Sequence, residues 1–254
     1  MKTLSIFTAK GGCGKTTNTI LMAACLAYKH KKKVLVIDFE APSFRIRQFR
    51  DRDIKESTTP GTPLFNYLVN HPQDHTSFEI QCHGKEINQY STNDIVKLVN
   101  MINGIIAKDE YDYLLFDFPA GLSKDTLVSY LAVNHLIDLV CIPSSTEAQE
   151  RYEAYRTGVA LKNVGQDVRL FWNRIQSGYV KAPELLQPAE EGMKQAGLKY
   201  LKSKIKNFSK ATQTADTRCF VRNTLCWPER YIEMACPELI SLLEEIKEIL
   251  DAKE

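Results

Sequence analysis

The sequence predicts an α/β fold in which helices cover both faces of a mostly parallel central sheet. Short, continuously apolar segments recur along the chain and end in a polar residue, as buried parallel strands often do. Helix-like segments alternate with them, and a glycine-rich loop joins the first strand to the first helix. This alternation is typical of parallel sheets, whose ligands sit at the carboxyl ends of the strands.

Five apolar segments are predicted to be buried strands. They are Leu4 to Phe7, Val34 to Asp38, Tyr113 to Asp117, Leu139 to Pro143 and Val168 to Asn173. The predicted helices are Thr17 to His30, Ser91 to Lys108, Lys124 to His135, Ser145 to Asn163, Ala182 to Gln195 and Pro237 to Ala252. The last of these carries a leucine and isoleucine stripe, so we expect it to pack on the body of the domain.

The chain is predicted to form a single domain over residues 1–254. A chain of 254 residues can bury a large core, and 44% apolar with 25% charged residues indicates a globular rather than a disordered protein. The stretch from about 50 to 90 is polar, contains Pro60-Gly61-Thr62-Pro63 and lacks a long periodic pattern. We interpret it as a variable insertion with one short helix near Leu64 to Val69.

Cysteine usage and the lack of a targeting segment predict a cytoplasmic protein. The seven cysteines are odd in number and scattered, which fits reduced thiols better than a disulfide framework. Met1 leads directly into a strand-like segment without an export signal, and the apolar run from Leu136 to Pro143 is too short to cross a bilayer. We therefore expect no membrane association.

A loop with three glycines and two lysines follows the first strand: Lys10-Gly11-Gly12-Cys13-Gly14-Lys15-Thr16-Thr17. A nucleotide triphosphate carries several negative charges, and glycines let backbone N–H groups approach them without a Cβ in the way. Because the loop opens a helix, the helix N-terminus adds its partial positive charge. The pattern predicts a binding site for ATP with Mg²⁺.

The polar residues of this loop have distinct expected roles. Lys15 is expected to reach the β- and γ-phosphates, Thr16 to offer its hydroxyl to magnesium, and Thr17 to donate near the α-phosphate. Gly11, Gly12, Cys13 and Gly14 complete the phosphate cradle. The strict pattern G-x-x-x-x-G-K-[ST] is broken, because Ala9 stands in place of its first glycine and the loop carries Lys10 instead.

Two aspartates at predicted strand ends, Asp38 and Asp117, are candidate magnesium ligands beside Thr16. Magnesium keeps much of its hydration and takes few direct protein ligands, so we expect both acids to act through water. The alternative is that each is an ordinary helix-capping aspartate. Their common place beside a phosphate loop favours the magnesium role.

The segment from Lys10 to Thr17 resembles the signature K-G-G-x-G-K-[ST]-[ST] of the ParA/MinD family of ATPases. Val34 to Glu40 resembles the family's switch I strand, usually ending D-x-D, and Asp117 to Gly121 resembles its switch II segment, D-x-P-x-G. Phe171-Trp172-Asn173-Arg174 is similar to the strand whose asparagine reads the adenine edge. The matches follow the family's order over roughly residues 1 to 175 and imply a SIMIBI-like P-loop NTPase fold.

The resemblance implies a nucleotide-sandwich homodimer, in which Lys10 would cross to the phosphates held by the partner subunit, as an arginine finger does. It also implies nucleotide contacts for Asn173 and Arg174. Glu40 stands where the family usually has the aspartate that orients the attacking water, and its extra methylene displaces the carboxylate. We therefore expect slow, partner-stimulated ATP hydrolysis, with Lys10, Lys15, Asp38 and Glu40 as the catalytic residues.

A basic segment, Lys199 to Phe208, is a candidate DNA-binding element. As a strand it would place Lys202, Lys204 and Lys206 on one face, and with Arg218 and Arg222 these form a potential patch for DNA phosphates. The family resemblance favours DNA binding. The alternative is a solvated edge strand whose lysines discourage pairing with another chain.

The leading hypothesis is a ParA-like ATPase that acts in the partitioning of DNA, plasmids or mobile elements. In this hypothesis ATP drives dimerisation and non-specific DNA binding on the nucleoid, and a ParB-like partner stimulates hydrolysis to release the protein. Two alternatives use the same phosphate loop. One is a small-molecule ligase of the dethiobiotin-synthetase type, which would not need Lys10.

The other alternative is a MinD-like positioning ATPase, which would reach the bilayer through a basic amphipathic C-terminal helix. The acidic residues Glu244, Glu245 and Glu248 in that region argue against it. A zinc site is a weaker possibility still. His71, His75, Cys82 and His83 have nearly suitable spacing, but no paired C-x-x-C accompanies them.

Overall fold

The structure is a computed structural model of the chain. The structure describes residues 1–75, 78–83, 91–120, 134–176, 182–207, 223–227 and 237–253, together with Val128, Leu131, Ala132, Gly178 and Tyr179. Most of the predicted helix from Lys124 to His135, and both Arg218 and Arg222, lie outside these residues.

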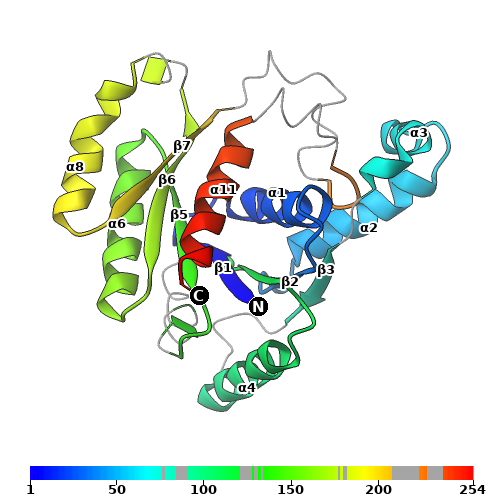
Figure 1. The fold of residues 1–254 in the computed structure, drawn as a ribbon, viewed down its shortest axis with the longest axis horizontal. Helices are drawn as coiled ribbons and strands as arrows, with labels where there is room; N and C mark the ends of the chain where they lie inside the picture. The colour runs from blue at the N-terminus through cyan, green and yellow to red at the C-terminus, as the bar shows by residue number, and fades with distance from the viewer. Residues whose placement is uncertain are drawn as a thin grey trace.

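Seven strands form one sheet in the order β3-β2-β4-β1-β5-β6-β7 (Figure 1). Their bounds are β1 Lys2–Ile6, β2 Val34–Asp38, β3 Glu79–Cys82, β4 Tyr113–Asp117, β5 Leu139–Ser144, β6 Val168–Ile175 and β7 Lys199–Lys206. Every neighbouring pair runs parallel. The predicted fold class, a parallel sheet with helices on both faces, is confirmed.

The strands divide their apolar side chains between two cores because successive residues of a strand point to opposite faces. In β2, Val34 and Val36 join the core beneath α1 (Lys15–Tyr28) and α11 (Pro237–Asp251). Leu35 and Ile37 join the core on the other face, beneath α4 (Thr92–Lys108) and α6 (Ala148–Asn163). Burial on both faces explains why these strands are apolar throughout.

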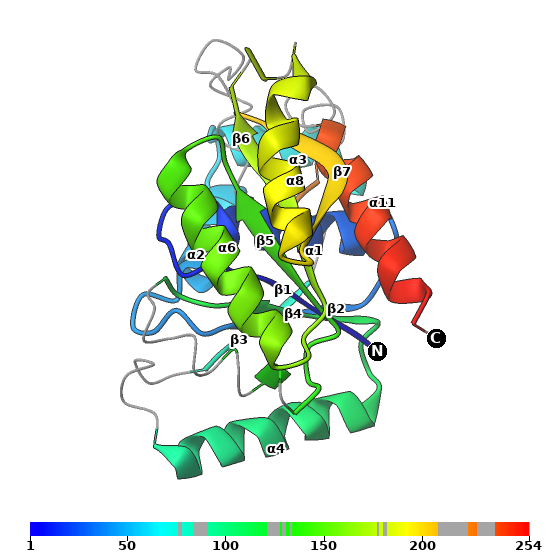
Figure 2. The ribbon, with the colours of Figure 1, turned by 90° about the vertical axis from the view of Figure 1, so that its left-hand side faces the viewer.

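One layer of helices covers each face of the sheet, as the two views show (Figures 1 and 2). In Figure 2, α6 and α8 (Gln187–Gln195) lie side by side, while α4 lies apart from them across the end of the domain. The predicted bounds of α4 are nearly those observed. Its start is set by a capping box, in which Ser91 and Asp94 each accept a hydrogen bond from the other's backbone N–H.

The segment from 45 to 83 is more regular than the sequence indicates. It contains α2 (Arg45–Thr58), the expected short helix α3 (Pro63–Asn70) and the edge strand β3. Helix α2 is not predicted from the sequence because it buries only Ile46 and Asp53 and so shows no apolar stripe. Strand β3 is not predicted either, because most of its side chains are exposed. Part of the proposed insertion therefore belongs to the central sheet.

The C-terminal helix α11 packs on the body of the domain, as expected. Its buried side chains are Leu239, Leu242, Leu243, Ile246 and Leu250, and they join the core that contains α1. The carboxylate of Glu245 accepts the backbone N–H groups of Lys202 and Ser203 at 2.7 Å each, which ties α11 to the edge strand β7. Within the described residues, no helix is both long and apolar enough to span a bilayer.

Candidate nucleotide-binding site

The glycine-rich loop connects the end of β1 to the start of α1, and two of its glycines have backbone conformations that other residues rarely adopt. Gly12 has φ +76° and Gly14 has φ +93°. A Cβ on Gly14 would lie 2.9 Å from Asn173 Nδ2, so the position is closed to a side chain for steric reasons as well. These glycines leave the backbone bare where phosphates are expected.

The start of α1 has the electrostatic properties of an anion site. Gly14 is its N-cap, so no side chain satisfies the first backbone N–H groups, and no acidic residue lies in the first turn. A cavity of about 140 Å³ opens here, a size suited to phosphate groups rather than to a whole nucleotide. Its lining includes Gly11, Gly12, Gly14, Lys15, Thr16, Thr17, Glu40 and Arg45.

Lys15 is buried beside this cavity, with only 7% of its surface exposed. Its ammonium donates to the backbone carbonyl of Lys10 at 2.8 Å and lies 3.9 Å from the sulfur of Cys13. The loop backbone therefore surrounds the ammonium of Lys15. In this position Lys15 could exchange its hydrogen bond to the Lys10 carbonyl for hydrogen bonds to phosphate oxygens. Burial raises the pKa of the Cys13 thiol, so this residue acts as a packing group rather than a thiolate.

Asp38 and Asp117 lie directly opposite each other at the carboxyl ends of β2 and β4. The two carboxylates are differently engaged. Asp38 accepts the backbone N–H groups of Glu40 at 2.9 Å and Ile46 at 3.0 Å, so it also anchors the start of α2, which gives the capping alternative partial support. Asp117 is fully buried, and its Oδ2 has no hydrogen-bond partner among the described residues.

These residues fit a magnesium ion. The unpartnered buried oxygen of Asp117 and the Thr16 side chain, which hydrogen-bonds the same carboxylate, supply the oxygen donors that magnesium prefers. Asp117 is the better placed of the two acids, because the oxygens of Asp38 already accept backbone hydrogen bonds. When bound with a nucleotide, the ion would neutralise charge on the β- and γ-phosphates.

Asp117 is expected to make the stability of the nucleotide-free protein depend on pH. Burial, with a smaller contribution from Asp38, raises its pKa from 3.8 to about 8. The folded state then binds the proton more tightly than the unfolded state, so the stabilisation is complete below about pH 4 and is lost as pH rises towards 8. Urea denaturation without Mg²⁺ across this range should show a falling free energy of unfolding. Asp117→Asn should flatten that slope, and an unchanged slope would contradict the assignment.

Glu40 lies at the cavity, in the loop between β2 and α2. Its Oε1 is 3.2 Å from Nε of Arg45, the first residue of α2, which lines the same cavity. Phe44, the N-cap of α2, has φ +39°, an unusual conformation for a bulky residue that orients the helix start. The carboxylate of Glu40 is therefore held by a partner that the sequence analysis did not identify.

Asn173 and Arg174 reach from the end of β6 to the backbone of the phosphate loop. Asn173 Nδ2 donates to the carbonyl of Cys13 at 2.7 Å, and Arg174 donates to the carbonyl of Gly12 at 2.8 Å. The structure thus brings both predicted nucleotide contacts to the loop. These two hydrogen bonds orient the backbone of the loop, and a direct contact with adenine stays a prediction.

Lys10 lies beside the N-terminus of α6. Its ammonium is 3.6 Å from a carboxylate oxygen of Glu147 and 3.4 Å from one of Glu150. Arg174 also donates to Glu150, at 2.6 Å. Burial disfavours the charged form of Glu150, but hydrogen bonds from Ser145 and Arg174 and the charges of Arg174 and Lys10 hold its pKa below the usual range.

Glu147 and Glu150 are the functional candidates that sequence reasoning missed. Acidic residues in the first turn of a helix are common because they complement the helix dipole, so their spacing carries no signal of a contact with the loop. Only the fold brings them to Lys10, from 137 and 140 residues along the chain. They neutralise Lys10, the lysine that the family resemblance predicts to contact the phosphates held by a partner subunit.

The lysines of β7 lie at the outer edge of the sheet, opposite the edge formed by β3. Lys204 is 3.0 Å from Glu190 of α8, and Lys206 forms an ion pair with Glu238 of α11. Lys202 is exposed. Two of the three lysines are thus paired with acids, and the predicted partners Arg218 and Arg222 fall outside the described residues. Within those residues, the histidines and cysteine at 71–83 form no metal-binding cluster of three or more ligands.

Sequence comparison supports a nucleotide-binding chain. A family model described as an AAA domain matches residues 1–56. An uncharacterised ATP-binding protein of Methanocaldococcus jannaschii is 26% identical over 211 residues, covering 77% of this chain and 78% of the relative. A ParA family protein of Chlamydia trachomatis is 26% identical over 215 residues, covering 76% of this chain and 80% of the relative.

Solved structures of the same fold include MinD proteins. The MinC:MinD cell division protein complex of Aquifex aeolicus matches with a TM-score of 0.65 and 20% identity, covering 97% of this chain and 96% of that chain. The septum site-determining protein MinD of Pyrococcus horikoshii, complexed with Mg-ADP, matches with a TM-score of 0.61 and 19% identity, covering 100% and 98%. At these identities the likeness establishes the fold.

Proposed function

This chain belongs to the ParA/MinD family of P-loop ATPases, and we propose that it is a ParA-like member acting in DNA, plasmid or mobile-element partitioning. In this proposal it binds Mg-ATP, forms a nucleotide-sandwich homodimer in the cytoplasm and binds DNA without sequence preference. A ParB-like partner then stimulates ATP hydrolysis, which releases the protein from DNA.

The observation that carries the proposal is the separation of the two loop lysines. Lys15 lines the phosphate cavity of its own subunit, whereas the lining in the described part of the chain does not include Lys10. Lys10 instead lies between Glu147, which is 67% exposed, and the buried Glu150. The pair with the exposed Glu147 contributes only about 1 kcal/mol or less. The buried Glu150 keeps its hydrogen bond from Arg174 at 2.6 Å when Lys10 leaves, so Lys10 can move to the phosphates of a second subunit.

The remaining cavity residues support phosphoryl transfer to water. Lys15 and the bare backbone of the loop would hold the phosphates, and Thr16 with Asp117 would hold magnesium, with Asp38 acting through its hydration shell. Glu40 is the acidic side chain that lines the cavity at the switch I position, so it is the candidate for orienting the attacking water. Its ion pair with Arg45 supports a low basal rate, because the carboxylate must be released or shared for that task.

The packing of α11 favours the partitioning proposal over a MinD-like role at a membrane. A helix that inserts into the interface must present its apolar face to lipid. The apolar stripe of α11 is instead buried against the core beneath the sheet. The ligase alternative is addressed by Lys10, since a self-sufficient phosphotransferase does not need a second loop lysine that lies outside its own phosphate cavity.

DNA binding by β7 is tested by replacing Lys202, Lys204 and Lys206 together with Gln. We expect about a tenfold loss of ATP-dependent DNA affinity and a shallower salt dependence, since each phosphate contact contributes about 0.9 to the slope of log K against log salt. Gel shifts with ATP, ADP and no nucleotide, repeated at several salt concentrations, measure both quantities.

The matched control for this experiment replaces two exposed lysines of α4, Lys97 and Lys108, with Gln. That variant should bind DNA as the parent does, and both variants should keep the parent's affinity for ATP, because neither strand β7 nor helix α4 lines the phosphate cavity. Equal DNA binding by the β7 variant and the parent would remove β7 from the proposed DNA surface.

A further inference from the structure

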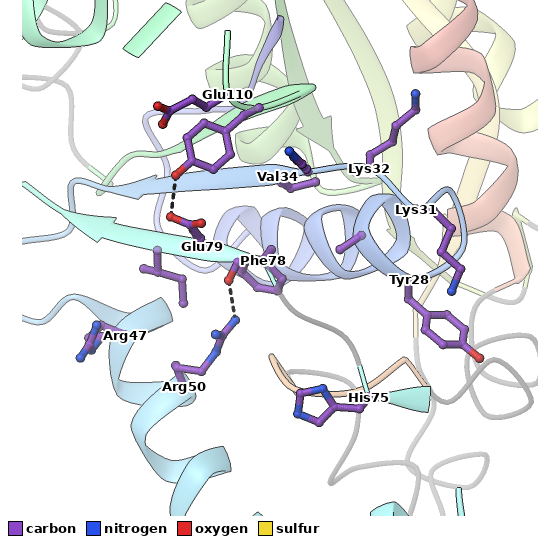
Figure 3. Close-up of a pocket in the computed structure, with 14 residues that line it drawn as sticks. Tyr28, Lys31, Lys32, Val34, Arg47, Arg50, His75, Phe78, Glu79 and Glu110 are labelled. Carbon is purple, nitrogen blue, oxygen red and sulfur yellow. Dashed lines mark hydrogen bonds between the residues drawn. The ribbon is translucent and has the colours of Figure 1, made fainter. Parts of the chain in front are cut away.

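A second cavity, larger than the phosphate cavity, lies between the end of α1, the first half of α2 and the start of β3 (Figure 3). Its volume is about 930 Å³, within the range of sites that bind organic ligands or peptide segments. Arg45 of α2 lines the phosphate cavity, whereas Arg47 and Arg50 of the same helix line this one. We call it the basic cleft.

The basic cleft carries an excess of positive charge. Lys31, Lys32 and Lys33 line it from the connection between α1 and β2, and Arg47 and Arg50 line it from α2. The acids that line it are Glu79 and Glu110. Two further carboxylates lie next to its cations, Asp51 beside Arg47 and Asp112 beside Lys32, so the excess of positive charge is small. Glu79 is further engaged by the hydroxyl of Tyr111, which donates to it at 2.5 Å. The remaining charge favours an anionic ligand.

Two of these cations, Arg50 and Lys31, contact neutral groups. Arg50 donates to the carbonyls of Phe78 and Thr224 and to the Thr224 hydroxyl, all neutral oxygens. The ammonium of Lys31 lies 4.6 Å from the ring centroid of Tyr28. Lys31 and Lys33 are exposed at the rim. Arg47 forms an exposed ion pair with Asp51 at 3.2 Å, and Lys32 lies 3.8 Å from Asp112. The positive charge left for the carboxylates of a ligand is therefore mainly that of Lys31, Lys33 and Arg50.

The floor of the basic cleft is apolar. Phe78 and Val34 are almost fully buried beneath it, so the apolar surface open to a ligand comes from the half-buried Ile80, Ala27 and Tyr111 along its walls. A ligand that carried only charge would leave this surface exposed to water, whereas one with both acidic and apolar side chains would cover it. This combination of an apolar floor and a cationic rim is matched by a peptide in which acidic and apolar residues alternate.

Nucleic acid fits the basic cleft less well. Proteins that bind single strands combine a basic groove along the backbone with aromatic rings on which the bases stack. Here the ammonium of Lys31 lies over the face of the Tyr28 ring, and the guanidinium of Arg50 lies over the Phe78 ring, 4.8 Å from its centroid. Both rings are therefore covered on one face. A duplex presents rows of phosphates to a surface and has no apolar groups at its backbone with which to fill an apolar floor.

We propose that the basic cleft is a docking site for an acidic, partly apolar segment of a partner protein. The segment's carboxylates bind Lys31 and Lys33 at the rim and compete with Asp51 for Arg47, and its apolar side chains cover Ile80 and Tyr111. The site is separate from the phosphate cavity and from β7, and binding there requires no nucleotide.

The test is fluorescence anisotropy with a labelled peptide of about twelve residues that alternates Glu and Leu, measured on the full chain without nucleotide. We expect binding in the range of tens of micromolar at low salt. Lys31→Glu/Lys33→Glu and, on the other wall, Arg47→Glu should each weaken it about tenfold. The control variant Lys97→Glu/Lys108→Glu, on α4, should bind as the parent does. A peptide that alternates Gln and Leu should bind at least tenfold more weakly than the Glu peptide.

Each other outcome overturns the proposal. Binding that survives in both cleft variants, or that falls equally in the α4 variant, shows general attraction to a basic surface. Stronger binding of a single-stranded oligonucleotide of similar length, lost in the cleft variants, assigns the cleft to nucleic acid. Retained ATP affinity and an unchanged thermal midpoint show that the variants are folded, so loss of peptide binding is read independently of the proposed ATPase function.

Discussion

Lys10→Ala is expected to abolish ATP-dependent dimerisation while leaving the affinity for ATP within about threefold of the parent's. The reason is geometric: Lys10 lies between Glu147 and Glu150, while Lys15 lines the phosphate cavity. Losing a charged contact across an interface costs about 2 kcal/mol or more. A symmetric dimer contains two Lys10 contacts, so the dimerisation constant should fall about a thousandfold. Light scattering with ATP, with ADP and without nucleotide measures it.

Two further variants make the Lys10 result specific. Lys15→Ala removes the cavity lysine and should lose ATP binding itself, which separates failure to bind from failure to dimerise. Glu147→Gln removes one resting partner of Lys10 and should leave dimerisation intact or stronger, because less has to be broken before Lys10 crosses the interface. If Lys10→Ala dimerises with ATP as the parent does, the sandwich model is wrong for this protein.

Glu40→Gln is expected to lower kcat about 100-fold with little change in KM, as removal of a group that positions or activates the attacking water does. Gln has nearly the same shape but no charge, so the loop between β2 and α2 should keep its backbone. The carboxylate lies at the phosphate cavity and forms an ion pair with Arg45, and Asp38 accepts the backbone N–H of Glu40. Steady-state phosphate release measures the rate.

Arg45→Gln is the matched control for Glu40→Gln. It breaks the same ion pair and frees the carboxylate, so a rate at or above that of the parent would show that the charge of Glu40 matters rather than the pair. Equal losses of kcat in the two variants would assign the effect to loop geometry. An unchanged rate in Glu40→Gln would mean that another group orients the water.

Much of the fold could be predicted because its signals are local. The strands β2 and β4 are short, wholly apolar and end in aspartate, since burial on both faces removes polar residues from their interiors. The start of α4 is marked by Ser91 and Asp94, whose mutual hydrogen bonds need only neighbouring residues. The phosphate loop is marked by glycines that the backbone itself requires.

The unpredicted elements have weak local signals. Helix α2 carries charged residues around most of its circumference, because it buries little against the body. Strand β3 is held by backbone pairing with β2, which depends on no side-chain pattern. The lysines of β7 illustrate a second limit: their alternation is visible in the sequence, but their pairing with Glu190 and Glu238 depends on how α8 and α11 pack.

By itself the sequence determined the parallel α/β fold, the phosphate loop from Lys10 to Thr17 and the two aspartates that follow strands. These depend on local backbone conformation and on the apolar content of single segments. Only the tertiary structure decided that Lys10 lies between Glu147 and Glu150, that Glu40 pairs with Arg45, and that lysines and arginines from separate elements line one cleft. These contacts join residues through the packing of helices on the sheet, and charged side chains leave no periodic pattern that would reveal such partners in advance.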